Sequence, residues 1–144
     1  MDVTTSITKT MEALTKISKQ TDKAVLSATR KVGAEATRTM KKQIVGGHKL
    51  GTPRSAGENI VAGKPSNVTG NLRRSIRSSV QGFNGRYTMT VGAYMVYARA
   101  LEFGHPRWRS GVKYPFVAPT AKILSENNKA RDVYIKELHR VLKS

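Results

Sequence analysis

The most suggestive chemical motif in this chain is a glycine-rich stretch ending in lysine, of the kind that can bind phosphate. A phosphate-binding loop has four residues between its two glycines and a Ser or Thr after the Lys, because backbone N–H groups, an ammonium and a magnesium-binding hydroxyl all contact the phosphates. Here five residues separate Gly57 from Gly63, and Pro65 follows Lys64. The match fails at both positions, so these glycines are expected to shape a loop.

Histidine, acidic and nucleophilic residues offer no better candidate for catalysis or metal binding. His48, His105 and His139 lie far apart in sequence, without the close spacing of zinc ligands. The nine acidic residues are scattered, and the sequence contains no cysteine and no Gly-x-Ser-x-Gly element. We therefore expect no enzyme activity, no cofactor and no metal ion. Glu102, an acid in a basic region, is expected to pair with an arginine or to cap backbone donors.

Positive charge is the strongest compositional feature. The net charge is +17, and residues 36–125 carry 15 Lys or Arg against Glu58 and Glu102, a local balance of +13. Such a field attracts phosphate backbones and acidic protein surfaces, and both remain candidate partners. The residues expected to contact DNA or an acidic partner are Lys49, Arg54, Lys64, Arg73, Arg77, Arg86, Arg107 and Arg109.

The 144 residues suit one domain spanning 1–144, and no stretch approaches the roughly 18 apolar residues of a membrane span. Residues 1–45 contain no proline, and their apolar residues recur at helical spacing, which predicts a long amphipathic helix. Its apolar stripe is thin, because Ser18 and Thr21 interrupt it. Part of the helix is expected to pack on neighbouring subunits, and a solvated helix with a frayed N-terminal third is the alternative.

Paired glycines at 46 and 47 are expected to end this helix, and residues 46–70 are expected to form an extended loop that becomes ordered at an interface. Two alternating runs then predict a hairpin, with Asn84-Gly85 supplying the positive φ angles of the turn. One face of the hairpin should be basic. The apolar positions are Leu72, Ile76, Val80, Tyr87, Met89 and Val91, and the basic ones are Arg73, Arg77 and Arg86.

Helical spacing returns at residues 94–103, where Gly104 and Pro106 are expected to end a short helix, and again at 119–143. The expected fold is therefore α+β: a long N-terminal helix, a small antiparallel sheet built around a hairpin, a short helix and a C-terminal helix. The hairpin and the short helix would form a core unit at 71–121. The side chains expected to be buried are Leu72, Ile76, Val80, Tyr87, Met89, Val91, Tyr97, Leu101, Phe103 and Phe116.

Several sequence blocks occur in order within this core unit. They are Thr69-Gly70-Asn71-Leu72-Arg73-Arg74-Ser75-Ile76, Tyr97-Ala98, Leu101-Glu102-Phe103-Gly104 and Pro115-Phe116-Val117-Ala118-Pro119. Their order and spacing resemble the neck, or tail-completion, proteins that join head to tail in long-tailed bacteriophages. The resemblance implies that core or interface roles fall to Gly70, Leu72, Ile76, Tyr97, Leu101, Glu102, Phe103, Gly104, Pro115, Phe116 and Pro119.

The resemblance also implies a structural role in the virion. Proteins of this kind form rings. For this chain the expected ring is a hexamer, and a dodecamer is the alternative. The ring would sit at the neck against head-closure, tail-terminator and tail-tube proteins and line the path of viral double-stranded DNA. Synthesis would take place in the host bacterial cytoplasm. The bulky, basic run from His105 to Trp108 departs from the family pattern, so the sequence leaves open which neck ring the protein forms.

A non-specific, nucleoid-type DNA-binding protein is the competing interpretation. It explains the positive charge but not the sequence blocks.

Overall fold

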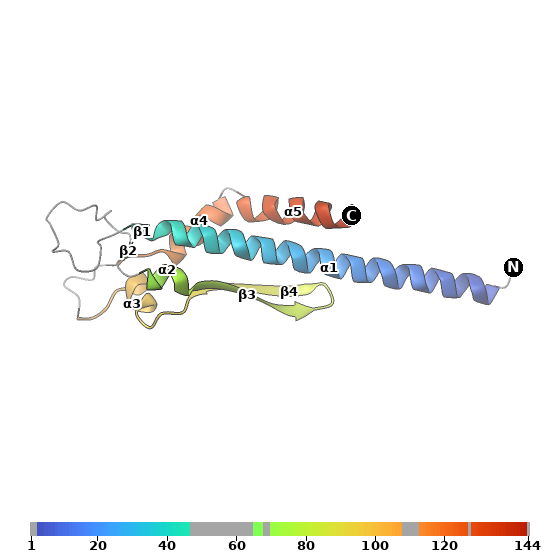
Figure 1. Cartoon of the computed structure of the whole chain (residues 1–144), viewed down its shortest axis with the longest axis horizontal. Coiled ribbons are helices and arrows are strands. Elements are labelled where there is room, and N and C mark those ends of the chain that lie inside the picture. Colours follow the sequence, from blue (N-terminus) through green and yellow to red (C-terminus); the bar gives the residue numbers. More distant parts are fainter. Residues whose placement is uncertain (1–2, 47–64, 68–69, 108–112, 127, 144) are drawn as a thin grey trace.

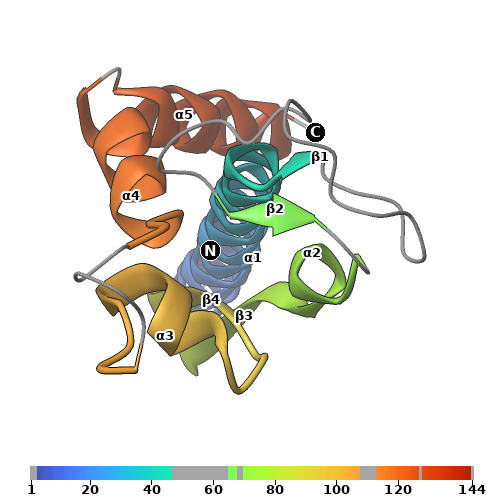
Figure 2. The same cartoon turned by 90° about the vertical axis from the view of Figure 1, so that its left-hand side faces the viewer.

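The computed structural model describes residues 3–46, 65–67, 70–107, 113–126 and 128–143. One long helix, α1 (Val3–Gln43), forms the axis of the molecule. A β-hairpin lies along one side of α1, and the C-terminal helices lie along the other (Figure 1). Seen along its length, α1 occupies the centre of a three-layer arrangement (Figure 2). The α+β prediction is confirmed.

The hairpin consists of β3 (Ile76–Phe83) and β4 (Arg86–Ala93), paired antiparallel from Ile76 opposite Ala93 to Phe83 opposite Arg86. Asn84 and Gly85 form the turn with φ angles of 50° and 75°, as a two-residue reversal requires. Tyr87, Met89 and Val91 alternate with exposed residues and are half-buried on the side that packs against α1. The predicted hairpin and its turn are therefore confirmed.

At Gly33 the hairpin packs closely against α1. A Cβ atom at this position would lie 2.9 Å from Met89 Sδ and 3.1 Å from Ser78 Cβ. The glycine therefore has a packing reason to occupy a helix interior, where it costs about 1 kcal/mol relative to alanine.

The first predicted strand begins later than its alternation suggested. Residues 71–75 form a short helix, α2 (Asn71–Ser75), so Leu72 and Arg73 are helical, and β3 starts at Ile76. Gly70 precedes α2 with φ 76°, and its carbonyl accepts the Arg74 N–H at 3.0 Å. Because residues four apart share one side of a helix, the spacing of Leu72 and Ile76 fits a helical turn as well as a strand.

The helix predicted at 94–103 is shorter than expected, and α3 spans only Ala98–Phe103. The hairpin continues to Ala93, and the Tyr94 N–H donates to Ser75 O at 3.3 Å, which holds residue 94 against the end of β3. A turn then leads into α3, where the Ala98 N–H donates to Met95 O. Gly104, with φ 85°, ends the helix as predicted.

The C-terminal region contains two helices where one was predicted at 119–143. They are α4 (Val117–Glu126) and α5 (Lys129–Leu142), with Asn128 between them at φ 49°. Asparagine tolerates the left-handed conformation, so it can reorient the chain at this point. The break allows α5 to run back alongside α1, on the side opposite the hairpin (Figure 1).

Two short strands were not foreseen. After α1 ends at Gln43, β1 (Val45–Gly46) pairs in parallel with β2 (Ser66–Asn67). Gly46 thus belongs to a strand beyond the helix end, and most of the loop predicted at 46–70 lies outside the described residues. Pro65, just before β2, is buried.

The hydrophobic core lies near the C-terminal end of α1. Met40 and Ile44 pack there with Leu72, Ile76, Ala98 and Phe116, and Val91, Ala93, Met95 and Leu101 pack around them. Of the side chains expected to be buried, Leu72, Ile76 and Phe116 are, and Val80, Tyr87, Met89, Val91 and Leu101 are half-buried. The expectation was wrong for Tyr97 and Phe103, which are 41% and 69% exposed. Tyr97 precedes the short α3 and Phe103 ends it, and the residues of this helix that pack on the core are Ala98 and Leu101.

Candidate assembly interface

Glu102 joins two of the sequence blocks. Its carboxylate accepts backbone N–H bonds from Phe116 at 2.8 Å, Val117 at 2.9 Å and Ala118 at 2.9 Å. These donors stand at the start of α4, where N–H groups have no partner within the helix and the helix dipole favours a negative charge. The expectation that Glu102 would cap backbone donors is confirmed.

A backbone bond supports the same junction, since the Tyr114 N–H donates to Leu101 O at 2.8 Å. Phe116 lies in the core at 1% exposed, and the Thr120 hydroxyl donates to its carbonyl at 2.6 Å. Pro115 and Pro119 are half-buried on either side. The Leu-Glu-Phe-Gly and Pro-Phe-Val-Ala-Pro blocks therefore form one structural unit that fixes α4 to α3.

The block residues divide into a scaffold and an exposed part. Gly70 and Gly104 adopt positive φ angles, and Leu72, Ile76 and Phe116 are buried. Among the residues expected to have core or interface roles, Tyr97 and Phe103 remain largely exposed. These two aromatic side chains are therefore accessible to another protein.

Four of the eight basic contact candidates lie among the described residues: Arg73, Arg77, Arg86 and Arg107, all exposed. Lys49, Arg54, Lys64 and Arg109 lie outside them. Arg73 belongs to α2, whereas Arg77 and Arg86 stand on the hairpin face that points away from α1. Arg77 is six residues from Phe83, the partner of Arg86, which is about 20 Å along a strand. Arg77 and Arg86 therefore lie far apart on the outer face of the hairpin and do not converge on a pocket.

Asp22 anchors the hairpin tip to α1, a contact that the sequence interpretation missed. Its carboxylate accepts the Gly85 N–H at 2.5 Å and the Tyr87 hydroxyl at 2.8 and 2.9 Å. The hydrogen bond to Asp22 raises the pKa of Tyr87, because ionising the phenol would remove the donated proton. An acid on a lysine-rich helix was the available signal, but its partners are more than 60 residues away in the sequence.

Acidic residues also fix α5 to α1. Glu137, which is 7% exposed, accepts bonds from the Ser27 hydroxyl at 2.7 Å and from Arg140 at 2.6 and 2.9 Å. The bonds from Arg140, and then that from Ser27, lower the pKa of Glu137 to about 2. Lys129 Nζ lies 2.6 Å from Glu35 Oε1 and lowers the pKa of that carboxyl.

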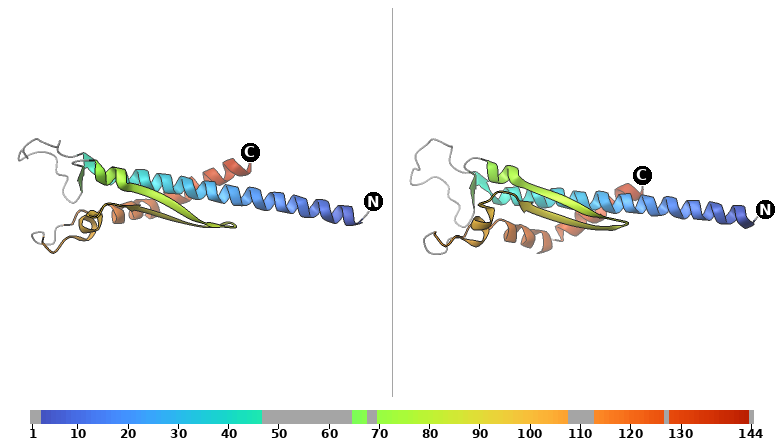
Figure 3. Two further views of the ribbon diagram at one scale, coloured as in Figure 1. Left: turned by 60° about the horizontal axis from the view of Figure 1, so that its bottom comes forward. Right: turned by 90° about the horizontal axis from the view of Figure 1, so that it is seen from below.

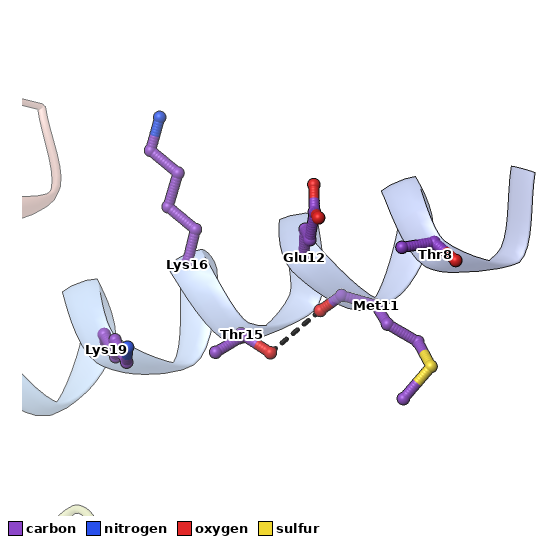
Figure 4. Close-up of a pocket in the computed structure, with 6 residues that line it drawn as sticks. All are labelled: Thr8, Met11, Glu12, Thr15, Lys16 and Lys19. Atoms are coloured by element: carbon purple, nitrogen blue, oxygen red, sulfur yellow. Dashed lines mark hydrogen bonds between the residues drawn. The ribbon is translucent and has the colours of Figure 1, made fainter. Parts of the chain in front are cut away.

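The N-terminal half of α1 has no cover. It extends beyond the hairpin tip and beyond the end of α5 in every side view (Figures 1 and 3), and residues 7–20 are all exposed. A hollow on this half is lined by Thr8, Met11, Glu12, Thr15, Lys16 and Lys19, all from one helix. The side chain of Met11 projects away from those of Glu12 and Lys16 (Figure 4). The hollow is thus an open helix surface.

Among the described residues, no group of three or more His, Cys, Asp or Glu side chains is placed to hold a metal ion. Within the same part of the chain, no helix has both the length and the apolar character to cross a membrane.

Comparison with protein families identifies a match over most of the chain. Residues 8–104 match the family described as "Bacteriophage HK97-gp10, putative tail-component". The match covers about two thirds of the chain, from α1 through the hairpin to the end of α3, and stops before α4. Comparisons with curated proteins and with solved structures returned no significant match. The chain belongs to the HK97-gp10-like family of bacteriophage tail components.

Proposed function

We propose that this tail component forms a ring at the junction of head and tail, where it completes the tail and lines the DNA path. The ring would be a hexamer, with a dodecamer as the alternative. Its neighbours would be head-closure, tail-terminator and tail-tube proteins. The role is one of assembly and not catalysis, and synthesis in the host bacterial cytoplasm would precede incorporation into the virion.

The observation that carries this proposal is the uncovered half of α1. A soluble monomer gains little by extending a helix with exposed Ile7, Met11, Leu14 and Ile17 into water, because apolar area is stabilising only where it is buried. A subunit of an assembly can bury the same area against a neighbour. Membership in a tail-component family supports the same conclusion.

A phage that lacks this gene provides the test. We expect electron micrographs to show filled heads and tails that remain separate, and a plasmid copy of the gene to restore joined, infectious particles. Immunogold labelling of complemented virions should place the protein at the head–tail junction. Normal particles in the absence of the gene would contradict the proposal, and so would label along the tail shaft or at its distal end.

Non-specific binding to DNA is the second candidate function, favoured by the exposed arginines on the outer hairpin face and the charge of +17. The pair Arg77→Gln and Arg86→Gln should weaken duplex DNA binding and reduce its salt dependence by about two released counterions. Lys9→Gln with Lys16→Gln removes equal charge from the distant end of α1 and serves as the matched control. Equal losses in both variants would show that the field of the whole protein, and not the hairpin, attracts DNA.

A further inference from the structure

The exposed half of α1 carries a continuous apolar strip, here called the N-terminal stripe: Ile7, Met11, Leu14 and Ile17. These residues follow one another at spacings of four, three and three, which keeps them on one side of a helix. They are 54%, 64%, 61% and 59% exposed. Lys9, Lys16 and Lys19 project from the opposite side by the same helical geometry. The stripe therefore has the form of a docking surface about 15 Å long.

The stripe continues the buried side of the same helix. Farther along α1, Ala28, Ala36 and Met40 are buried between the hairpin and α5. The hairpin and α5 cover α1 only as far as about Asp22, which holds the hairpin tip. The apolar pattern of the helix continues beyond this point toward the N-terminus. A partner that covers the stripe would extend an interface that the fold already contains.

A second apolar surface lies at the other end of the molecule. Tyr94, Val96, Tyr97 and Phe103, here called the α3 corner, are 63%, 99%, 41% and 69% exposed within a ten-residue segment. Exposed aromatic residues are enriched at protein interfaces, because their large area becomes buried at low entropic cost. The Glu102 cap on α4 and the buried Ala98 hold this segment to the scaffold.

The two surfaces lie at opposite ends of the long axis (Figures 1 and 3). A two-fold contact between stripes would leave the α3 corner in water, and a two-fold contact between corners would leave the stripe in water. One head-to-tail contact covers both in every copy.

We propose that the N-terminal stripe of one copy docks on the α3 corner of the next copy, forming the contact that closes the ring. This inference deepens the proposed function and depends on it. A head-to-tail contact of this kind closes into a ring when the rotation from one copy to the next is a whole-number fraction of a full turn. With any other rotation it gives a filament.

Two variants break the contact from opposite sides. The stripe variant carries Met11→Glu and Leu14→Glu, and the corner variant carries Val96→Glu and Phe103→Glu. All four side chains are more than half exposed, so both variants should fold, as checked by circular dichroism and thermal unfolding. Lys9→Gln with Lys16→Gln changes the charge by the same amount on the opposite side of α1 and is the matched control.

Mass measured by light scattering and analytical ultracentrifugation distinguishes the arrangements. We expect the wild type and the lysine control to form oligomers, and each glutamate variant alone to be monomeric, with self-association weakened at least tenfold. An equimolar mixture of the two variants should form dimers and nothing larger, because one intact stripe then meets one intact corner. A corner variant that still dimerises would overturn the proposal in favour of stripe-to-stripe pairing. A mixture that stays monomeric, or a wild type that never self-associates, would also overturn it.

Complementation in the phage separates this inference from the proposed function. If the deleted gene is required for joining and both glutamate variants restore normal particles, the head-to-tail contact is wrong while the neck function stands. If deletion has no effect on joining, the neck function is wrong, and the mixing experiment still decides how copies associate.

Discussion

The two halves of α1 share an apolar helical periodicity but differ in what covers it. Beyond Asp22 the helix lies between the hairpin and α5, and Ala24, Ala28, Ala36 and Met40 are almost fully buried. Before Asp22 the apolar positions are larger, and Ile7, Met11 and Leu14 are all more than half exposed. The covered half uses alanine because two layers approach it closely. The uncovered half carries bulkier residues that suit a surface supplied from outside the chain.

Two methionines on the same helix give the sharpest test of this comparison. Met40 is 2% exposed, and Met11 is 64% exposed. Met40→Ala should lower the free energy of unfolding by about 2–5 kcal/mol, because it leaves a cavity in the core. Met11→Ala should change it by less than about 0.5 kcal/mol in the monomer. Urea unfolding at low protein concentration measures both. If both variants lost a similar amount of unfolding free energy, the Met11 side chain would have to be buried in the monomer.

Gly33 tests how closely the hairpin approaches the covered half. Gly33→Val should destabilise the fold by about 1–3 kcal/mol, because its side chain would collide with Met89 and Ser78. Ala13→Val, at an exposed position of the uncovered half, should cost only the difference in helix propensity, about 0.5 kcal/mol. Thermal unfolding of both variants gives the measurement, and a neutral Gly33→Val would mean that the hairpin moves away at little cost.

Asp22 marks the boundary between the two halves. Asp22→Ala should lower the free energy of unfolding by about 1–2 kcal/mol, because Tyr87 and the turn lose their acceptor. It should also increase amide exchange at the hairpin tip while leaving the core protected. Glu12→Ala, which removes an acid from the uncovered half, is the control and should leave exchange at the tip unchanged. Unaltered exchange in Asp22→Ala would show that packing alone holds the hairpin.

The acid dependence of stability should report the contact between α5 and the covered half. The Glu137 carboxyl has a folded pKa of about 2 and an ordinary value of 4.5, so between these pH values the unfolded chain binds more protons. The contribution to stability is complete above pH 4.5 and is lost as the pH falls toward 2. Glu137→Gln should flatten the stability profile in this window. Glu126→Gln, on an exposed part of α4, should leave the profile as in the wild type.

Local patterns were sufficient for much of the fold. Apolar residues at helical spacing, without an intervening proline, predicted the long helix, and Asn84-Gly85 predicted the hairpin turn, because both depend on short-range patterns in the chain. The boundaries at 71–75 and 94–97 were wrong, because Leu72 and Ile76 fit either a helix or a strand until their neighbours are known. The helical spacing of apolar residues continues through both C-terminal helices, but the chain changes direction at Asn128. The tertiary structure explains this break, because it allows α5 to pack back along α1.

The candidate interface shows the same division. The sequence identified Tyr97, Glu102 and Phe103 as members of linked blocks and expected Glu102 to cap backbone donors or pair with an arginine. Only the tertiary structure showed that the donors belong to α4 and that Tyr97 and Phe103 point outward. The partnership of Asp22 with the hairpin turn was also beyond sequence reasoning, since no local pattern connects residues so distant in the chain.

By itself the sequence determined the element types, the amphipathic character of α1, the concentration of positive charge in residues 36–125 and the resemblance to a phage structural family. These properties depend on residue type and short-range spacing. The tertiary structure alone decided which half of α1 is covered and which exposed aromatics share a corner. Burial depends on contacts between residues far apart in sequence, and the periodicity of one helix is the same whether its apolar side faces its own chain, a second copy or water.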